Sequence, residues 1–393
     1  MKLRKETWDQ VELKEILQFK NGFNFNKGTR HSGWRLFGVS DFQDHFFAKY
    51  KDIPFLIADR IPSDDYLLRD NDMLFVRSNG NRELVGRTLL FKEIPFNATF
   101  SAFCIRGRIY DSNVDPIYLA YCTKSSAFRD NLIRLVQGTN ITSISQTLLS
   151  QLEIPIPPLE EQKQIAALFQ SIDTAIEQTE AQEKNLFQTK RQLLWELFSE
   201  KQEFGSYLNS ENYKTIYFGD VSQHISKRVA PAKTDLKIYV GLEHLDPDNL
   251  RIERQGSPAD VKGTKLLVWK GDIIFGKRRA YQRKIAVSHF EGICSAHSMV
   301  LRAKEDVIKK EFLPYFMQSD VFMDRAVQIS EGSLSPTIKW KVLEKQKFAI
   351  PKMEFQEKLT GLFRHFDKLI YELKGQKKTL TKLKQKLLDE IFG

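Results

Sequence analysis

The chain has 393 residues, 41% of them hydrophobic, which is enough for two or three domains with buried cores. Its 60 Lys and Arg against 50 Asp and Glu give a formal net charge of +10, which favours polyanionic partners, nucleic acid before membrane. There is no apolar run of membrane-spanning length, no secretory leader pattern and no paired-cysteine motif, so we expect a cytoplasmic protein rather than a membrane or disulfide-rich secreted one.

Residues 1–153 are expected to form a first globular domain in which helices and strands mix. Runs rich in β-branched and aromatic residues, separated by turn formers, predict strands at 34–39, 72–77 and 101–106. A single helix is predicted over 116–136. The domain is therefore of mixed α and β type.

The stretch that follows this domain occurs twice in the chain. Residues 154–199 match residues 348–393 at a constant offset of 194 without a gap, so that Asp173 corresponds to Asp367. A gapless match of this length is rarely chance and indicates an internal repeat. We expect a central spacer helix at 154–200 and a C-terminal spacer helix at 348–393.

Both copies have the pattern of long helices. Pro157 and Pro158 suit a first helical turn, and Glu160 and Glu161 follow at the positive end of the helix dipole. Apolar residues then alternate in steps of three and four, as in the seam of a coiled coil. The predicted seam positions are Ile165, Leu168, Ile172, Ala175, Thr179, Gln182, Leu186, Thr189 and Leu193, and Leu359, Leu362, Phe366, Leu369, Leu373, Gln376, Leu380, Leu383 and Leu387.

Charges beside the two seams favour pairing of one copy with the other. The first helix carries acidic residues where the second carries lysines: Glu177, Glu180 and Glu183 against Lys374, Lys377, Lys378 and Lys382. A two-fold relation between the copies makes the coiled coil antiparallel, with Gln182 and Gln376 near the crossing, where they would set the register. At about 1.5 Å per residue, some 40 residues make a spacer of roughly 60 Å. The alternative is two ordinary amphipathic helices with solvated faces.

A polar linker at 201–210 leads into a second globular domain, residues 211–347, which repeats the first plan more loosely. The strand at 72–77 resembles residues 271–275, and the offset of 194 returns near the end of the domain, where Tyr121 matches Tyr315. The predicted fold class is α+β: two mixed α/β domains separated by two long helices that form an antiparallel coiled coil, with a pseudo-two-fold internal repeat.

Divergent domains on a repeated frame suggest variable recognition, and both domains carry polar, basic loops. Arg can read guanine, Asn can read adenine, Lys or Arg can neutralise phosphates, and small donors suit backbone contacts. The candidate DNA-binding residues of the first domain are Lys20, Asn21, Lys27, Arg30, Arg35, Arg77, Asn79, Asn81, Arg82, Arg87, Thr139 and Asn140. Those of the second are Lys227, Arg228, Lys262, Lys265, Lys277, Arg278, Arg279, Tyr281, Arg283, Lys284, Ser333 and Ser335.

For any one of these residues, a merely solvated side chain is the competing interpretation. The cluster at 277–284 is the exception, because its charge density and Tyr281 favour contact with DNA. No residues are predicted to be catalytic or to bind a metal, since the seven histidines are scattered without metal-ligand spacing.

The two helix starts carry a family resemblance. Residues 157–165 (PPLEEQKQI) and 351–359 (PKMEFQEKL), with 239–245 (YVGLEHL) and 271–275 (GDIIF), resemble the specificity subunit of type I restriction-modification enzymes. The resemblance covers the whole chain. The second copy departs from the pattern, since Phe355 stands where the first copy has Glu161.

The resemblance implies a non-catalytic subunit whose two globular domains are target recognition domains, each reading one half of a bipartite, asymmetric sequence in double-stranded DNA. The helices would set the distance between the halves and dock two methyltransferase subunits, which a motor-nuclease subunit joins for restriction. It further implies that S-adenosylmethionine, ATP and Mg²⁺ are bound by those partner subunits, so we expect no cofactor in this chain.

The sequence also lacks the motifs of the competing enzymatic functions. It contains no Asn-Pro-Pro-Tyr or Asp-Pro-Pro-Tyr tetrad for a flipped adenine, no GxGxxG and no GxxxxGK[ST]. Glu161-Gln162-Lys163 has the Glu-x-Lys spacing of many nucleases, but it lies at a helix start without an upstream Pro-Asp. The rival from another class is a basic coiled-coil interaction scaffold without sequence-specific DNA binding.

Overall fold

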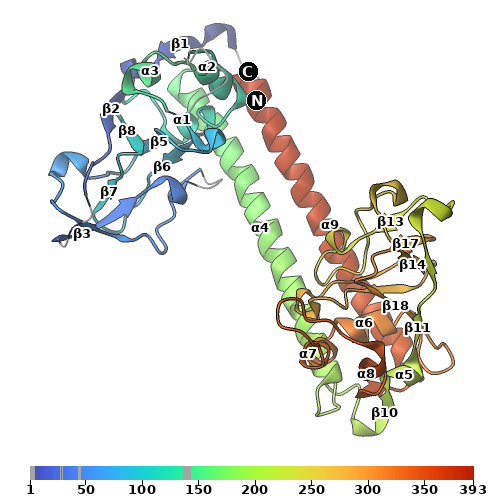
Figure 1. The fold of residues 1–393 in the computed structure, drawn as a ribbon. Helices are drawn as coiled ribbons and strands as arrows, with labels where there is room; N and C mark the ends of the chain where they lie inside the picture. The colour runs from blue at the N-terminus through green and yellow to red at the C-terminus, as the bar shows by residue number, and fades with distance from the viewer. Residues whose placement is uncertain (1–4, 27, 29, 43–45, 136–142) are drawn as a thin grey trace. The chain divides into compact units, whose positions relative to one another are not determined.

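The computed structural model describes residues 5–26, 28, 30–42, 46–135 and 143–393, with the side chains of 30–32 left out. The chain forms two compact units (Figure 1). Unit 1 comprises residues 1–179 and 376–393, and unit 2 comprises residues 180–375. The division falls inside the long helices, so each unit holds half of each helix.

Unit 1 contains a four-stranded sheet, a three-stranded sheet and a two-stranded ribbon. Their strand orders are β2-β8-β5-β6, β4-β3-β7 and β1-β9. The strands are β1 Asp9–Glu12, β2 Leu17–Asn21, β3 Arg30–Phe37, β4 Phe55–Ala58, β5 Asp72–Val76, β6 Thr88–Leu90, β7 Ala98–Phe100, β8 Cys104–Ile109 and β9 Glu153–Ile156. The helices are α1 Pro116–Cys122, α2 Ser126–Leu135 and α3 Gln146–Ser150, with the first half of α4 Leu159–Phe198 and the last part of α9 Met353–Phe392.

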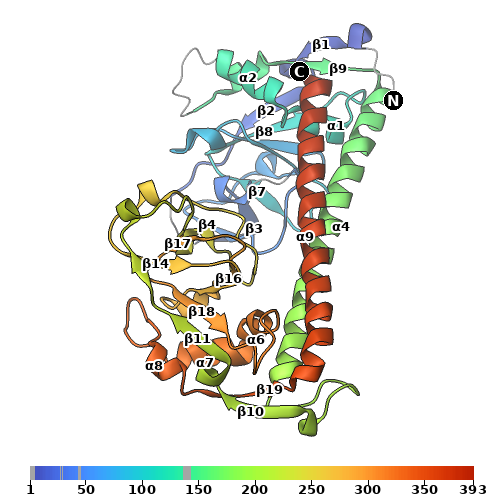
Figure 2. The same cartoon turned by 90° about the vertical axis from the view of Figure 1, so that its right-hand side faces the viewer.

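Unit 2 contains two four-stranded sheets and a two-stranded ribbon, in the orders β11-β18-β15-β16, β12-β14-β17-β13 and β10-β19 (Figure 2). The strands are β10 Tyr213–Tyr217, β11 Ser222–Ile225, β12 Arg228–Val229, β13 Tyr239–Val240, β14 Lys265–Val268, β15 Ile273–Phe275, β16 Ile285–Val287, β17 Gly292–Cys294, β18 Met299–Ala303 and β19 Lys347–Pro351. The helices that lie wholly in this unit are α5 Phe218–Val221, α6 Leu313–Gln318, α7 Asp320–Gln328 and α8 Trp340–Leu343.

The internal repeat is visible in the sheets. The sheet β2-β8-β5-β6 has the same strand order as β11-β18-β15-β16, and both are antiparallel throughout. The second sheets share one parallel pair, β3 with β7 and β13 with β17, but differ in the order of the remaining strands. The predicted fold class is confirmed, and the divergence between the units lies mainly in this second sheet.

The central strand of each repeated sheet is buried on both faces, which explains its continuous apolar run. In β5, Phe75 packs in a core with α1 and the long helices, whereas Leu74 packs against the second sheet. In β15, Phe275 likewise packs in the core with the helices, and Ile274 packs against the second sheet. Each unit is therefore layered as helices, repeated sheet and second sheet.

A buried aspartate lies at the start of each of these central strands, as the first residue of β5 and as the residue just before β15. Asp72 accepts two hydrogen bonds from Arg108, both at 2.8 Å, and Asp272 accepts two from Arg302 at 2.7 and 3.0 Å. The residue before Asp272 is Gly271, with a φ of 92° that favours glycine. The Gly-Asp pair of the sequence motif therefore forms a turn and an ion pair whose carboxylate is buried.

The predictions for the first domain are partly corrected. The strand at 72–77 is confirmed as β5, but the helix predicted over 116–136 is two helices, α1 and α2. Ser125 lies between them, donates to the carbonyl oxygen of Cys122 at 2.7 Å and accepts the N–H of Phe128 at 3.2 Å. This cap ends one helix and begins the next.

The repeated stretch does not begin as a helix. Its first residues form β9 in one copy and β19 in the other, which pair antiparallel with β1 and β10 respectively. The helices begin at Leu159 and Met353, after the prolines, and not at the predicted 154 and 348. The prolines lack the N–H that a helix interior needs, so the strand ends there and the helix follows.

A fully buried glutamine in the first turn of each long helix links the helix to its unit. Gln162 donates to the carbonyl oxygen of Pro157 at 2.8 Å and accepts the backbone N–H of Asp115 at 2.8 Å. Gln356 makes the corresponding two bonds in unit 2, both at 2.9 Å. The glutamine of the repeated motif therefore satisfies backbone groups at the junction of strand and helix.

In unit 2 the two long helices are joined by a buried lysine. The ammonium of Lys190 on α4 lies 2.5 Å from the carboxylate of Asp367 on α9, which also accepts a hydrogen bond from Tyr315 of α6 at 2.9 Å. Burial lowers the pKa of Lys190 below its ordinary value, and the attraction of Asp367 opposes part of that effect. Seven residues earlier on α4, Glu183 pairs with Lys374, seven residues later on α9. The two helix halves are therefore antiparallel.

Unit 1 repeats this arrangement with the roles of the helices exchanged. Lys384 on α9 forms an ion pair with Asp173 on α4, and Tyr121 of α1 donates to the same carboxylate at 2.7 Å. The rings of Phe169 and Phe392 stack with centroids 6.1 Å apart, so this pair of helix halves is also antiparallel.

The predicted seam is correct along one of its two lines. The positions from Ile165 to Leu193 and from Leu359 to Leu387, in steps of seven, are buried or half-buried. The other line is wrong by one residue: Leu383 is 44% exposed, whereas the adjacent Lys384 is buried. Leucine was the expected seam residue because lysine is normally solvated, but a lysine can be buried when a carboxylate pairs with it.

We predict that Lys190→Met destabilises unit 2 by about 3 kcal/mol, because it leaves the Asp367 carboxylate without its cation. Adding Asp367→Asn should recover most of this loss, since the double variant buries no charge. Urea denaturation followed by circular dichroism measures both. The control is Lys374→Met, whose partly exposed pair with Glu183 spans 3.9 Å and should contribute at most about 0.5 kcal/mol. Equal losses in the single and double variants would contradict the pairing.

Candidate nucleic-acid interface

Three segments of unit 2 meet beside the repeated sheet. The basic loop (277–284) follows β15, the ring turn (295–298) joins β17 to β18, and the donor loop (332–337) follows α7. The sequence predicted the first and third of these segments as separate DNA-contacting loops. The structure brings them together and adds the second.

Backbone hydrogen bonds fasten the three segments to one another. The N–H of Arg278 donates to the carbonyl oxygen of His297 at 3.3 Å, and the N–H of Arg279 donates to that of Pro336 at 2.7 Å. Arg279 has a φ of 58°, in the left-handed region that non-glycine residues rarely adopt. The basic loop is therefore held in one conformation by its neighbours.

Side chains of the basic loop reach the other two segments. A guanidinium nitrogen of Arg278 donates to the hydroxyl of Ser335 at 2.9 Å, and another lies 3.3 Å from the imidazole Nε2 of His297. Arg279, which is exposed, lies 3.5 Å from the same hydroxyl. Both guanidinium groups thus lie next to one small hydroxyl, and no carboxylate takes part in these three contacts.

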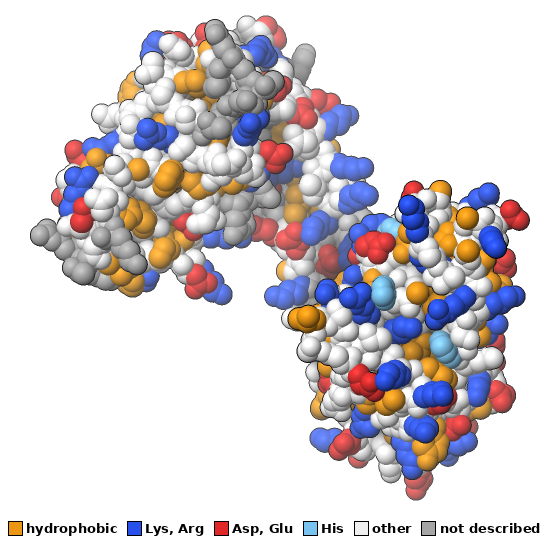
Figure 3. Space-filling model, viewed as in Figure 1, with side chains coloured by type: hydrophobic (Ala, Val, Ile, Leu, Met, Phe, Trp, Pro, Cys, Tyr) orange, Lys and Arg blue, Asp and Glu red, His pale blue; other side chains and the backbone are white. Residues whose placement is uncertain are grey.

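Positive charge dominates the electrostatics of this site. Burial, followed by repulsion from Arg278, Lys277 and Lys265, lowers the pKa of His297. Burial, followed by repulsion from Arg228, lowers the pKa of Lys277. Figure 3 shows Lys and Arg side chains gathered with histidines on one face of unit 2. Such a concentration of like charge is suited to a polyanion.

Unit 1 has the same arrangement of segments. The N–H of Arg77 donates to the carbonyl oxygen of Phe103 at 2.7 Å, and the carbonyl oxygen of Arg77 accepts from Ile144 at 2.8 Å. Ser78 and Ser143 form a β-bridge between the basic loop of unit 1, which follows β5, and the segment that precedes α3. The ring of Phe103 is 60% exposed. Each unit therefore places a basic residue beside a ring residue in the turn before β8 or β18.

Sequence reasoning missed the ring turn. Phe103 and His297 are separated by the offset of 194 that relates the two long helices, and this offset was the available signal. The signal is weak because a phenylalanine and a histidine share little chemistry.

Comparison with known proteins identifies the family. Residues 5–186 and 211–382 each match the model described as the type I restriction modification DNA specificity domain. The chain belongs to this family. As a specificity subunit with two such domains, it is of the non-catalytic class, as predicted from its helix-start motifs.

Individual relatives span nearly the whole specificity subunit. A putative type I restriction enzyme MjaX specificity subunit from Methanocaldococcus jannaschii is 23% identical, over 98% of this chain and 93% of its own length. The MjaVIII specificity subunit of the same organism is 24% identical, over 85% of this chain and 81% of its own.

Solved structures share the fold. One, described as the basis of complex assembly and conformational transition of the type I R-M system, aligns with a TM-score of 0.62 at 16% identity, covering 99% of this chain and 98% of that one. The S subunit from M. genitalium aligns with a TM-score of 0.57 at 16% identity, covering 100% and 98%.

Two predicted DNA contacts of the specificity subunit hold the basic loop together instead of pointing outward. Arg283 donates to the carboxylate of Asp248 at 2.7 and 3.0 Å and to the carbonyl oxygen of Gln318 at 2.6 Å, and it pairs with Asp320 at 2.9 Å. Lys284 donates to a backbone carbonyl oxygen at 2.7 Å. We therefore assign both side chains to the structure of the loop.

Several predicted residues of unit 1 also have internal partners. Asn79 and Asn81 each accept a backbone N–H two residues further on, which stabilises the basic loop of that unit. Lys20 pairs with an exposed aspartate at 3.2 Å, Arg35 lies 3.5 Å from the centre of a phenylalanine ring, and Arg87 donates to a backbone carbonyl oxygen at 3.2 Å.

The remaining predicted residues fall into three groups. Those with exposed side chains are Asn21, Arg82, Lys227, Arg228, Lys262, Tyr281 and Ser333. Lys265 is half-buried and donates to carbonyl oxygens of its own loop. Lys27, Thr139, Asn140 and the side chain of Arg30 lie outside the described residues. Gln182 and Gln376 are exposed and belong to different units, and their role in setting the register of the coiled coil stays a prediction.

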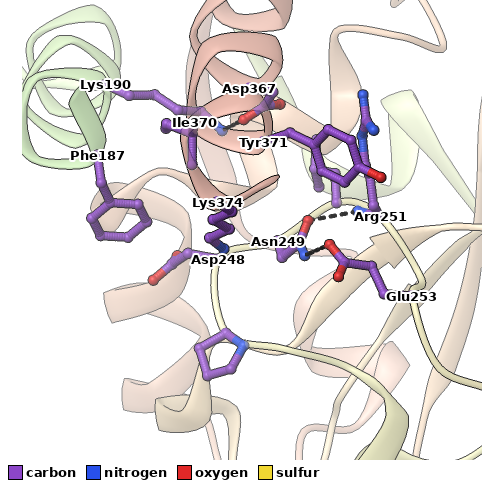
Figure 4. Close-up of a pocket in the computed structure, with 12 residues that line it drawn as sticks. Phe187, Lys190, Asp248, Asn249, Arg251, Glu253, Asp367, Ile370, Tyr371 and Lys374 are labelled. Atoms are coloured by element: carbon purple, nitrogen blue, oxygen red, sulfur yellow. Dashed lines mark hydrogen bonds and ion pairs between the residues drawn. The ribbon is translucent and has the colours of Figure 1, made fainter. Parts of the chain in front are cut away.

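A small cavity in unit 2 lies where the recognition domain meets α4 and α9 (Figure 4). The guanidinium of Arg251 lies 4.1 Å from the centre of the Tyr371 ring on α9, and Asn249 bonds to both Arg251 and Glu253. These contacts brace the loop that carries Asp248 against the helix. The cavity therefore belongs to the packing of the domain on the helices.

Within the described ranges, no group of three or more His, Cys, Asp and Glu is placed to hold a metal ion. No helix among the described residues is long and apolar enough to cross a bilayer. The three cysteines are free and buried.

We predict that Lys277→Ala raises the pKa of both His224 and His297, because Lys277 lowers both in addition to their burial. A pH titration of the imidazole signals by NMR measures this. Lys270→Ala, an exposed lysine that does not contribute to either shift, is the control and should leave both values unchanged.

The same shifts predict an effect on stability. The unfolded chain binds protons at these histidines more readily than the folded one, so their contribution to stability is lost as pH falls below about 6.5. Lys277→Ala should weaken this loss. If the pKa values of His224 and His297 stayed unchanged in that variant, repulsion from Lys277 would not be a cause of their low values.

Proposed function

We propose that the chain recognises a bipartite, asymmetric sequence in double-stranded DNA, with unit 1 reading one half and unit 2 the other. The observation that carries this proposal is the duplicated arrangement of a basic loop, a ring turn and a third loop on a repeated helical frame. Arg77 and Phe103 in unit 1 correspond to Lys277 and His297 in unit 2, because the carbonyl oxygens of Arg77 and Lys277 accept the N–H groups of Ile144 and Ile338 at equivalent places. Lysine and arginine supply phosphate contacts and exposed polar groups supply base contacts.

The helices have a separate role in this proposal. α4 and α9 set the distance between the half-sites, about one turn of DNA centre to centre, and offer docking surfaces for two methyltransferase subunits. A motor-nuclease subunit joins through them. S-adenosylmethionine, ATP and Mg²⁺ are held by those partner subunits. The relatives named as specificity subunits of type I restriction enzymes support this division of labour.

Selection from a random duplex library tests the proposal. The chain with its methyltransferase partner should recover a motif of two unlike halves separated by a fixed gap. The variant Arg278→Ala, at the site of unit 2, should relax one half only, and Arg77→Ala should relax the other. A contiguous motif would refute bipartite reading, and salt-sensitive binding without sequence preference would favour the basic interaction scaffold.

The spacer role has its own prediction. Insertion of seven residues into both long helices, after Gln182 and after Gln376, adds about 10 Å while keeping the heptad register. The recovered motif should then keep both halves and gain a gap longer by about three base pairs. Insertion of the same seven residues into the polar linker at 201–210 is the control and should leave the gap unchanged. Altered halves with an unchanged gap would defeat the spacer role.

A further inference from the structure

The donor loop of unit 2 presents an apolar side chain to solvent. Leu334 is 90% exposed, more than any other large hydrophobic side chain in the described part of the chain. Exposing a leucine in this way gains nothing for folding, because its side chain contributes no burial. Single exposed apolar residues are common on proteins, so the setting of Leu334 decides whether it has a role.

The loop around Leu334 is fixed on both sides. Glu331 and Thr337 exchange backbone hydrogen bonds at 3.1 and 2.9 Å, which closes the base of the loop. Gly332 has a φ of 106°, which a side chain would resist, and this turn directs the tip. On the far side, Ser335 accepts from Arg278 at 2.9 Å. The leucine is therefore carried on a braced tip and not on a loose segment.

Cations lie directly beside this tip. Arg278 and Arg279, which contact Ser335 of the donor loop, belong to the basic loop. The backbone carbonyl oxygen of Lys277 accepts the N–H of Ile338, the residue after the donor loop, at 3.0 Å. A protein partner with an apolar pocket would not need this density of positive charge. A duplex supplies both complements, phosphates for the cations and stacked bases for the leucine.

We propose that Leu334 is an apolar wedge that unit 2 inserts at a base step of its half-site. This inference rests on the proposed function and deepens it. Insertion of a leucine between bases unstacks them and bends the duplex, so the step that opens with least cost is bound best. Unit 2 then reads part of its half-site through deformability, with pyrimidine–purine steps favoured at the wedge.

The experiment compares variants, each with its methyltransferase partner, on the duplex recovered by selection and on copies with one mismatched pair at successive positions. Leu334→Ala should bind the intact duplex at least about tenfold more weakly, because the base step must still open but no inserted side chain fills it. At one position, the mismatch should restore much of the loss, because the step is already open. Leu334→Met keeps an apolar side chain of similar length and should bind like the original protein.

Two controls separate the wedge from ordinary charge contacts. Ile133→Ala, which removes a 40% exposed apolar side chain from α2, outside the three segments of the interface, should leave affinity unchanged. Arg279→Ala should weaken binding to every duplex and reduce the salt dependence by about one phosphate contact, whereas Leu334→Ala should leave the salt dependence as it was.

The outcomes distinguish this inference from the function on which it rests. If the unaltered chain selects no sequence, the proposed function fails. If the unaltered chain selects a motif but Leu334→Ala binds it equally well, the wedge is refuted while the function stands. A loss of equal size on intact and mismatched duplexes would also refute the wedge, because the leucine would then act through a contact and not through deformation.

Discussion

The pairing of α4 with α9 depends on charges that each helix buries against the other. An ammonium group removed from water is costly unless a carboxylate pairs with it, and in both units the carboxylate in the ion pair comes from the opposite helix. Lys190 forms an ion pair with Asp367 in unit 2, and Lys384 forms one with Asp173 in unit 1. A parallel alignment would separate both lysines from these carboxylates. The direction of the helices is thus set by electrostatics as well as by apolar packing.

The same aspartates connect the helices to the rest of each unit. Tyr121 and Tyr315 donate to the carboxylates that the lysines approach, so one carboxylate holds the helix pair and a short helix of the recognition domain together. Gln162 adds a second tie at the start of α4. Rigid ties of this kind let the second sheet differ between units while the repeated sheet keeps its place on the helices.

Features with strong local signals were predictable from the sequence. The two long helices could be predicted from the gapless repeat around Asp173 and Asp367, and their starts from the prolines. Both signals are readable because periodicity and proline act within a few residues. The seam was misplaced by one residue since burial of Lys384 depends on a carboxylate on another helix. The break at Ser125 was missed because a single hydroxyl makes that cap. The burial of Lys384 is a tertiary effect that leaves little trace in one sequence, whereas the cap at Ser125 is local and uses a residue that commonly caps helices.

The backbone of the basic loop in unit 2 restricts which residues it can accommodate. Arg279 and Arg283 both have positive φ, 58° and 53°, on either side of a single helical turn. β-branched side chains are strongly disfavoured in that conformation, whereas glycine, asparagine and aspartate tolerate it. Tyr281, between them, carries no such restriction. We therefore expect this loop to vary in sequence mainly between Arg279 and Arg283, because only a few amino acids fit the backbone conformation at these two positions.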